Sequence, residues 1–345
     1  MLAMTHSLQD LSTFRIQASA QDIVTLETLE DIQTLIQDKT LENYDKHMIL
    51  WWGSNVVFAW DFEGLIVVNH LSWKEILSET DTTLTIQIAS WENRNEFVHW
   101  TLDQDLSGIE NLVMIPGSVW GAPVQNIWAY GVELRDSLMH VTWIDLTSGE
   151  ILTFNNEECE FGYRDSIFKH TLQQNFFITS IALLLHKTDQ NYNPRTHYAD
   201  IETVLGAQGR DGVSKLRPRD IAEAVSYLRS TKLPDPSEIG TVGSFFQNPI
   251  IPTDEFSILK DRFAELKWFP HQHGFTKLSA WQLIDLCGLK WSRHGNVGVY
   301  DRHALVLVNY GSSTKGDEIL ELIHHVQDQV YEKFGIRLVP EVNVI

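Results

Sequence analysis

The sequence predicts a mixed α+β protein, because helical and strand-like segments alternate along its 345 residues. Apolar residues recur at helical spacing in 28–38, 217–230 and 317–334. Short apolar runs typical of buried strands occur at 64–69 (GLIVVN) and 304–309 (ALVLVN). With 43% hydrophobic and 21% charged residues, the composition is that of a globular protein long enough for two or three domains.

The first half of the chain begins with a helix over 28–38, for which Thr28 is a candidate N-cap. Ile49-Leu50 end a strand, a tight turn follows at 53–55, and Val56-Val57-Phe58 begin another strand. The pattern then predicts, in order, strands at 64–69 and 84–90, a helix at 91–102, a hairpin over 139–154 that turns at Ser-Gly-Glu, and a buried strand at 176–185.

A second region starts near residue 216 and is richer in helices. The spacing predicts helices at 217–230, 254–266, 277–288 and 317–334, a short strand at 304–309, and a strand that closes the chain over 336–345. Pro234 ends the first of these helices because proline cannot continue one. Gly335 is placed to cap the last helix.

The charge balance and the termini exclude several classes of protein. A net charge of −20 argues against a uniform nucleic-acid binder, since phosphate neutralisation needs clustered lysine and arginine. Two cysteines far apart in sequence indicate a reducing compartment without a disulfide framework. The N-terminus lacks the features of a secretion signal, and the apolar run 176–185 is too short to span a membrane. We therefore expect a cytoplasmic protein.

Two stretches combine residue types that could carry chemistry. FGYRDSIFKH (161–170) contains Arg164, which could grip a carboxylate through two parallel hydrogen bonds; a polar loop with an Arg–Asp pair is the alternative. GTVGSFFQNP (240–249) places Ser244 on a glycine turn before two aromatic residues, where a weak acid could deliver a proton. Its alternative is a hairpin with a buried aromatic pair.

Two further patterns are weaker. Residues 115–134 are rich in Gly, Pro and small polar residues and could wrap a cofactor with backbone groups, or form only a long loop. His271 and His273, and the adjacent pair His324-His325, suggest a metal site. Adjacent helical residues point about 100° apart, and no third ligand follows at a recognisable spacing, so we predict no metal.

Taken together, these stretches resemble one family, the UDP-N-acetylenolpyruvoylglucosamine reductases, also called UDP-N-acetylmuramate dehydrogenases. The matching segments follow one another in family order over nearly the whole chain: GSN (53–55), IENLVMIPGSV (109–119), APVQNI (122–127), AYGVEL (129–134), FGYRDSIFKH, TKLPDP (231–236), GSFFQNP, the KL…LID pattern of 277–285, ALVLVN and the terminal LVPEV.

The resemblance implies a two-lobed FAD-binding α+β fold of the vanillyl-alcohol-oxidase type with a separate α+β substrate-binding domain. We expect lobe 1 at 1–72, lobe 2 at 73–210 with 326–345 returning to it, and the substrate domain at 211–325. It also implies a monomeric enzyme of peptidoglycan precursor synthesis, in which NADPH reduces bound FAD and the flavin passes a hydride to the enolpyruvyl ether of a UDP-sugar.

The resemblance also carries over roles for individual residues. Arg164 and Glu341 resemble the groups that stabilise the developing enolate, and Ser244 resembles the proton donor. The substrate-holding residues are matched by Tyr198, Lys232, Asn248 and Lys277, of which Tyr198 points to the subtype with a tyrosine-bearing loop. The cofactor-binding positions are matched by Gly53, Ser54, Asn55, Pro116, Gly117, Ser118, Gln125 and Asn126.

The sequence departs from this family pattern in one consistent way: tryptophan stands where glycine is expected. The positions that should line the flavin are Trp51, Trp52, Trp91, Trp120 and Trp128, with Trp281 and Trp291 in the substrate domain. Arg15 also replaces a glycine, and Arg94 replaces an aromatic residue. Because glycine permits close approach and positive φ, we predict that the five indoles impair FAD binding. The alternative is that the indoles point outward into solvent.

Three functional readings follow from these departures. The chain is an active flavoprotein reductase that accommodates the indoles, or a flavin-free, inactive form of the scaffold that still binds a UDP-sugar. So selective an exchange of glycine for tryptophan suggests engineering more than drift. A structural or interaction module unrelated to nucleotide sugars would require the TKLPDP and GSFFQNP matches to be coincidental.

Overall fold

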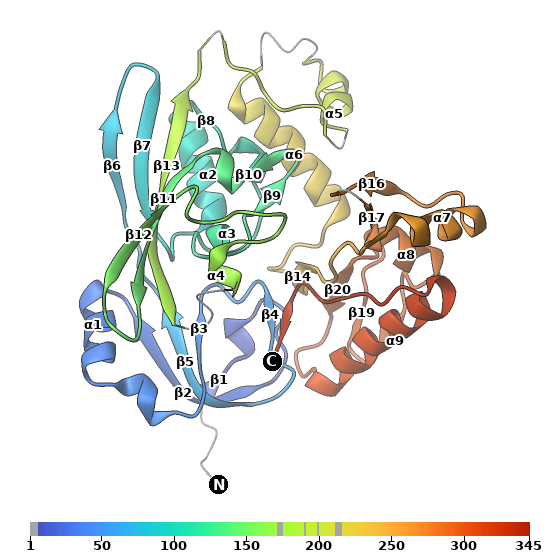
Figure 1. The fold of residues 1–345 in the computed structure, drawn as a ribbon, viewed down its shortest axis with the longest axis horizontal. Helices are drawn as coiled ribbons and strands as arrows, with labels where there is room; N and C mark the ends of the chain where they lie inside the picture. The colour runs from blue at the N-terminus through green and yellow to red at the C-terminus, as the bar shows by residue number, and fades with distance from the viewer. Residues whose placement is uncertain (1–5, 171–174, 190, 199, 211–215, 273) are drawn as a thin grey trace. The chain divides into compact units, whose positions relative to one another are not determined.

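The computed structural model describes residues 6–345 except 171–174, 190, 199, 211–215 and 273. The chain divides into two compact units. Unit 1 comprises Met1–Gln21, Gly53–Glu63 and Ser230–Ile345, and unit 2 comprises Asp22–Trp52 and Gly64–Arg229 (Figure 1). This division differs from the predicted domains, because 326–345 stays with 230–325 and the break falls after Arg229.

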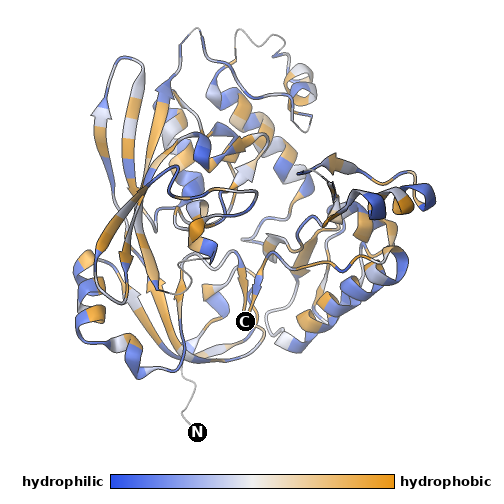
Figure 2. Ribbon diagram, in the orientation of Figure 1, coloured by the Kyte–Doolittle hydropathy of each residue, from blue (hydrophilic) through white to orange (hydrophobic). Residues whose placement is uncertain are grey.

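Unit 2 is built on an antiparallel sheet in the order β12-β11-β13-β7-β6, with β8 (Leu106–Ser107) also paired to β13. Its strands are β6 (Lys74–Glu79), β7 (Thr83–Ala89), β11 (Leu138–Asp145), β12 (Ile151–Asn155) and β13 (Phe176–Lys187). The predicted hairpin over 139–154 is confirmed by the pairing of Ile144 with Ile151. β13 is the predicted buried strand, and its apolar residues appear in orange along its length (Figure 2).

Among the helices of unit 2 are α1 (Leu29–Gln37), α2 (Arg94–Asp103), α5 (Ile201–Ala207) and most of α6 (Pro218–Lys232). Thr28 caps α1 as predicted, since its side chain accepts from the Asp31 amide while Asp31 accepts from the Thr28 amide. α6 joins unit 2 because its predicted apolar stripe lies in the core of that unit. This packing explains why the break falls within the last turn of α6 and not at residue 210.

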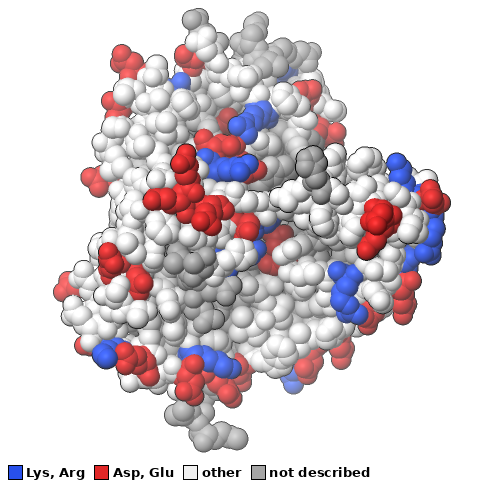
Figure 3. Space-filling view, viewed as in Figure 1, with Lys and Arg blue, Asp and Glu red and all other residues white. Residues whose placement is uncertain are grey.

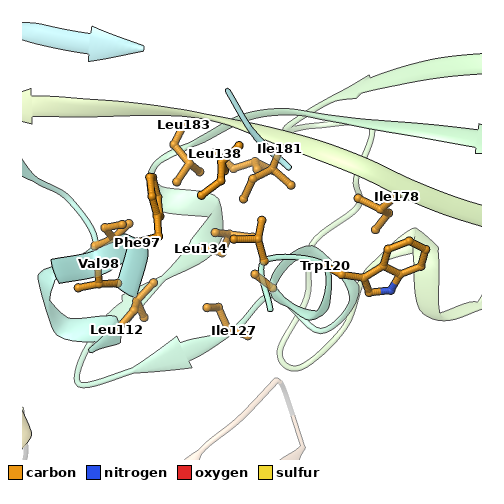
Figure 4. Packing of buried hydrophobic residues seen from close by; sticks show 14 of the residues in the cluster. Phe97, Val98, Leu112, Trp120, Ile127, Leu134, Leu138, Ile178, Ile181 and Leu183 are labelled. Carbon is orange, nitrogen blue, oxygen red and sulfur yellow. The ribbon is translucent and has the colours of Figure 1, made fainter. Parts of the chain in front are cut away.

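One hydrophobic core fills unit 2 between the sheet and its helices. Figure 4 shows Phe97 of α2 near Leu183 and Leu138 of the sheet, with Ile127 and Leu134 of the intervening loop alongside. Trp120 belongs to the same core and has no exposed surface. The loop 115–134 is therefore anchored by apolar side chains, and it contains short elements of its own: α3 (Gly121–Val124), β9 (Trp128–Ala129) and β10 (Val132–Glu133).

Unit 1 contains two small antiparallel sheets, ordered β14-β20-β19-β18 and β15-β17-β16. The first is formed by β14 (Gly240–Ser244), β18 (Arg293–His294), β19 (Val297–Val299) and β20 (Val306–Asn309), and the second by β15 (Ile250–Pro252), β16 (Trp268–Pro270) and β17 (Phe275–Leu278). Its helices are α7 (Thr253–Arg262), α8 (Ala280–Leu286) and α9 (Gly316–Phe334). α9 is the predicted amphipathic helix, with Gly335 at φ 72° capping its end (Figure 2).

The remaining strands are β1 (His6–Ser7), β2 (Ser19–Leu26), β3 (His47–Leu50), β4 (Val56–Val57), β5 (Phe62–Asn69) and β21 (Asn343–Val344), and the remaining helix is the short α4 (Ile167–His170). β1, β2, β5 and β3 follow one another in a four-stranded sheet, and β21 pairs with β4 in parallel. None of the helices described is at once long and apolar enough to cross a membrane. On the face in Figure 3, acidic side chains are widely spread and basic side chains form small groups.

Two predicted elements are wrong. Residues 277–288 do not form one helix: Lys277 and Leu278 belong to β17, and α8 begins only at Ala280. The predicted terminal strand is limited to β21, because the segment before it makes single contacts such as the bridge between Phe246 and Pro340. The prediction also missed β6, a strand whose residues are all exposed and which therefore carries no buried apolar signal.

Candidate functional site

Ser244 and Glu341, two of the predicted catalytic residues, lie on neighbouring segments of unit 1. The amide of Glu341 donates to the Phe245 carbonyl at 2.8 Å. Ser244 ends β14 at an irregularity in its pairing with β20, directly after Gly243 at φ 77°. The Ser244 side chain is exposed, while Phe245 and Phe246 behind it are buried with ring centroids 5.2 Å apart. The sequence-predicted aromatic pair is thus confirmed.

The turn at 53–55 lies beside the same terminal segment. Gly53 has φ 65°, and a Cβ there would lie 1.8 Å from the Leu11 carbonyl oxygen, so no other residue fits. The Asn55 side chain donates to the Glu341 carbonyl at 3.4 Å, and the Asn343 amide donates to the Asn55 carbonyl at 3.1 Å. Gly53, Ser54 and Asn55 therefore form a fixed turn in unit 1 that contacts the segment carrying Glu341.

The other predicted substrate residues of unit 1 lie on two elements. Asn248 accepts the Ala280 amide through Oδ1 at 3.0 Å, at the start of α8. Lys277 in β17 pairs with Ile250 of β15, and its ammonium lies 5.9 Å from the centre of the Phe269 ring. Lys232, exposed at the end of α6, lies close enough to His303 to help lower the pKa of that imidazole to about 4, after burial as the main cause.

Arg164, the remaining predicted catalytic residue, lies in unit 2 at the centre of a tight turn. The Gly162 amide donates to the Asp165 carbonyl at 3.0 Å, and Arg164 takes φ 54°, the left-handed region that non-glycine residues rarely adopt. Lys169 donates to the Arg164 carbonyl at 3.0 Å. The Asp165 carboxylate lies 2.6 Å from His170 Nε2. These contacts hold the arginine in a strained backbone conformation.

Tyr198 lies within an aromatic group of unit 2. Its ring meets the Trp128 ring edge-on with centroids 4.7 Å apart, and the Tyr130 ring at 6.3 Å. Burial, followed by the neighbouring Tyr163 and Tyr130 hydroxyls, raises the pKa of Tyr198. The Trp128 ring thus contacts a predicted substrate-holding residue, and its predicted cofactor-blocking role stays a prediction.

The predicted cofactor positions of unit 2 lie in the turn before α3 and just after that helix. Gly117 has φ 111°, and Ser118 is buried with an Oγ atom that contacts no polar group. Asn126 is also buried, and its side chain donates to Glu133 at 2.6 Å and to the Gly162 carbonyl at 3.2 Å while accepting the Arg135 amide. These bonds tie residue 126 to the Arg164 turn and support a structural role for its side chain. Pro116 and Gln125 are both partly buried.

Four of the five suspected blocking indoles pack as two pairs in unit 2. The Trp51 and Trp120 rings stack with centroids 5.4 Å apart and planes 17° apart. The Trp52 ring contacts the Trp91 ring at 5.0 Å, and the Trp91 ring contacts His70 at 4.3 Å. Trp120 is buried and the other four are half-buried, so the outward-pointing alternative does not describe Trp120. None of the five has positive φ, so the predicted backbone strain is wrong at these positions.

The departures from the family pattern in unit 1 behave differently. Arg15 and Trp291 do occupy the left-handed region, at φ 59° and 69°. Arg15 donates to the Pro236 carbonyl at 2.7 Å, whereas Trp291 is 72% exposed and points outward. Trp281 is partly buried between the ammonium groups of Lys267 and Lys290.

The orphaned polar atoms test whether these residues suit the FAD that the resemblance implies. Arg94 Nε, Ser118 Oγ and Arg229 Nε are buried without partners, and all belong to the turn 114–118 or to residues that contact it. Such donors fit a ligand that carries phosphate or carbonyl oxygens. The stacked indoles of Trp51 and Trp120, in contrast, add bulk beside α3, where Trp51 Nε1 lies 3.5 Å from a Cβ built on Gly121. That they displace the flavin stays a prediction.

Other candidate sites add little. A polar cavity of about 420 Å³ lies elsewhere in unit 2, and none of the predicted site residues lines it. Within the described part of the chain, no three His, Cys, Asp or Glu side chains group as metal ligands would. His325 contacts His294 at 5.0 Å, and His273 lies outside the described residues. Sequence analysis did not single out Arg229 or His303 as candidate functional residues. In the sequence each is only a polar residue next to apolar residues that the structure buries.

Comparisons with known proteins agree with this geometry. Residues 235–345 match the C-terminal domain of UDP-N-acetylenolpyruvoylglucosamine reductase, and residues 20–155 match an FAD binding domain. The chain is 39% identical to UDP-N-acetylenolpyruvoylglucosamine reductase of Flavobacterium johnsoniae over 98% of both chains. It is 40% identical to that of Chromobacterium violaceum, over 97% of this chain and 96% of the relative.

A solved structure supports the fold. The crystal structure of UDP-N-acetylenolpyruvylglucosamine reductase from Thermus caldophilus aligns with a TM-score of 0.67 and 22% identity, over 98% of this chain and 97% of that one. The predicted fold class, an α+β FAD-binding fold with a further C-terminal domain, is thereby confirmed. The matched regions and the identity over almost the full length show that the chain belongs to the family of UDP-N-acetylenolpyruvoylglucosamine reductases.

Proposed function

We propose that this chain is an FAD-dependent oxidoreductase that uses NADPH to reduce UDP-N-acetylglucosamine enolpyruvate to UDP-N-acetylmuramate, a step of peptidoglycan precursor synthesis. Family membership over nearly the whole chain supports the reaction. The observation that carries the assignment to residues is the 2.8 Å hydrogen bond between Glu341 and Phe245, which puts a carboxyl-bearing segment beside Ser244. The proposal includes a cytoplasmic, monomeric enzyme that binds no nucleic acid.

When bound, the flavin supplies the hydride that adds to the alkene of the substrate. The protein side chains contribute charge stabilisation and proton transfer to the reaction. Negative charge develops on the substrate carboxylate as the hydride arrives, and we assign its stabilisation to the Arg164 guanidinium and to Glu341 as an acid. We assign to Ser244 Oγ the proton delivered to the α-carbon, since its turn is rigid and backed by two buried rings.

We assign UDP-sugar binding to the four side chains that match the family's substrate-holding positions. Lys232 and Lys277 supply cationic groups for phosphate oxygens, and Asn248 supplies an amide. Tyr198, partly exposed at 43%, presents its ring and hydroxyl to the same ligand. The substrate domain is proposed to correspond to the 230–345 part of unit 1, close to the family match over 235–345.

A second candidate function is favoured by the indole cluster. With Trp51 stacked on Trp120 and Trp52 packed against Trp91, the chain as printed would not take up FAD, and it would remain a UDP-sugar-binding protein without activity. The two candidates differ in one readily measured property, which is bound flavin.

The experiment is the absorbance spectrum of the purified protein near about 450 nm, followed by a substrate-dependent NADPH oxidation assay. Flavin absorbance with oxidation supports the active reductase. A colourless protein that gains no absorbance on incubation with FAD, but binds UDP-sugar in calorimetry, supports the second candidate. Failure to bind FAD and UDP-sugar alike would contradict both.

A further inference from the structure

Two arginines of unit 2 hold the carbonyl groups of the turn 114–118. Arg94, the first residue of α2, donates through Nη1 to the Ser118 carbonyl at 3.3 Å and through Nη2 to the Pro116 carbonyl. Arg229, near the end of α6, donates through Nη2 to the Met114 carbonyl at 3.2 Å. Alternate carbonyls of the turn are thus directed at two guanidinium groups.

The charges of these arginines are not neutralised by the described residues. Arg94 is 7% exposed, and no carboxylate in the described part of the chain forms an ion pair with Arg94 or Arg229. Burial lowers the pKa of Arg94 to about 9, and repulsion from Arg229 and Arg164 adds to this. The N-terminus of α2 contributes further positive potential. A buried cation in such surroundings is strongly unfavourable unless an anion accompanies it.

Unused hydrogen-bond donors point to the same conclusion independently of charge. Arg94 Nε and Arg229 Nε are buried and have no acceptor, and Ser118 Oγ, in a residue with 1% exposure, has no partner. Buried donors are almost always satisfied by protein groups, ordered water or a ligand, so a group of three around one turn favours a site for a polar ligand.

We propose that Arg94, Arg229 and the Ser118 hydroxyl form an anion-binding site for a group with phosphate or carboxylate oxygens. Arg94 is the residue specific to this chain, since an aromatic residue was expected at its position. The inference deepens the proposed function, because the turn carries the predicted cofactor positions Pro116, Gly117 and Ser118. Its test uses small anions, so its failure is distinguishable from a failure to bind flavin.

The test is thermal unfolding of the full chain with inorganic pyrophosphate or with pyruvate, at ionic strength matched with sodium chloride. We expect the melting temperature to rise by about 4 °C when the better anion is present at a hundred times its Kd. Arg94→Gln and the volume-conserving Arg94→Met should abolish the rise, while Arg219→Gln, which removes an exposed ion pair with Asp103, should keep it. A larger shift with pyrophosphate indicates a phosphate ligand, and a larger shift with pyruvate a carboxylate ligand. No shift in the unmodified protein, or an equal shift in Arg94→Met, would overturn the proposal.

A different observation concerns the tryptophans themselves. Seven of the 12 tryptophans stand at positions where the sequence resemblance expects glycine: Trp51, Trp52, Trp91, Trp120, Trp128, Trp281 and Trp291. Trp291 combines a left-handed backbone with 72% exposure, so its indole gains neither burial nor a relaxed conformation. Trp120 buries its indole N–H without an acceptor. Neighbouring glycines such as Gly53 and Gly121 are nevertheless present.

We infer that these seven positions are encoded by UGA and that the organism that makes the protein reads UGA as glycine. UGA is a stop codon in the standard genetic code, tryptophan in some bacterial codes and glycine in others. Translation with tryptophan would place an indole at each such glycine and leave glycines with GGN codons unchanged. This accounts for a selective exchange without engineering.

The test is the gene sequence together with peptide mass spectrometry of the protein from its own host. We expect UGA at the seven positions, UGG at tryptophans such as Trp100 and Trp268, and glycine masses in the corresponding peptides. UGG codons at the seven positions, or tryptophan masses in the native peptides, would overturn the inference.

Discussion

The Ser244 turn of unit 1 and the 114–128 region of unit 2 differ in whether they keep the glycines that the family pattern expects. Before Ser244, Gly243 remains at φ 77° and the serine is exposed beside the Glu341 segment. In unit 2, Gly117 keeps its positive φ, but Trp120 and Trp128 occupy places where glycine was expected. The residues assigned to proton transfer are therefore intact where those assigned to the cofactor are altered. A loss confined to flavin binding would leave the rest of the site ready to work.

The largest expected effect comes from reversing that difference. If the second candidate holds and the printed chain takes up no FAD, replacing Trp51, Trp52, Trp120 and Trp128 together by glycine should recover FAD binding, because the stacked rings beside α3 are removed. The measurement is flavin absorbance after gel filtration, with Trp143→Phe, elsewhere in the core, as a control. A quadruple variant that folds and stays colourless would count against blockage by the indoles.

Ser244→Ala in a flavin-containing form of the protein tests the proposed role of Ser244 as proton donor. We expect the substrate-reduction half-reaction to slow by about 10²–10⁴-fold, because the proposed proton donor is lost, while reduction of the flavin by NADPH is unchanged. Stopped-flow absorbance follows the two half-reactions separately. Equal slowing of both would show that Ser244 is not the donor.

Two alanine substitutions of unit 1 glycines separate the cost of a steric overlap from the cost of a positive φ. Gly53→Ala should lower the free energy of unfolding by about 2–5 kcal/mol, because its Cβ would overlap the Leu11 carbonyl in addition to the unfavourable φ. Gly243→Ala meets nothing within 4 Å and should lower it by only about 1–2 kcal/mol. Urea unfolding measures both, and equal losses would mean that Leu11 moves aside.

His303 provides a smaller, pH-dependent contribution. Its pKa falls from 6.5 when unfolded to about 4 when folded, so between these values the unfolded chain binds the proton and the folded chain does not. Stability should therefore decrease as pH falls from 6.5 to 4, by at most about 3 kcal/mol. His303→Gln should flatten this part of the stability curve, and an unchanged slope would assign it to other groups.

The sequence predicted the elements whose signals are local. α1, α9 and β13 follow from a capping box, an apolar stripe and a continuous apolar run. β6 was not predicted because an exposed edge strand has no apolar alternation. The predicted helix over 277–288 began too early because Lys277 belongs to β17, where it pairs with Phe269 of β16. Tertiary packing decided both.

The same limit applies to the candidate site. Sequence order identified Ser244 and Glu341 but could not show that a hydrogen bond joins their segments. Nor could it show that Trp120 lies in the core and Trp291 in solvent, since both stand in turn-rich contexts. Arg229 could not be predicted as a site residue because its role depends on a hydrogen bond to Met114, which lies 115 residues earlier in the chain.

The left-handed backbone conformation of Arg164 means that its main chain is ordered before any ligand binds. Its conformation is fixed by the Gly162–Asp165 hydrogen bond and by Lys169, so the main chain is already committed once unit 2 has folded. An arriving carboxylate then has only the torsions of one side chain left to select, and the entropy of arranging the backbone does not weaken its binding.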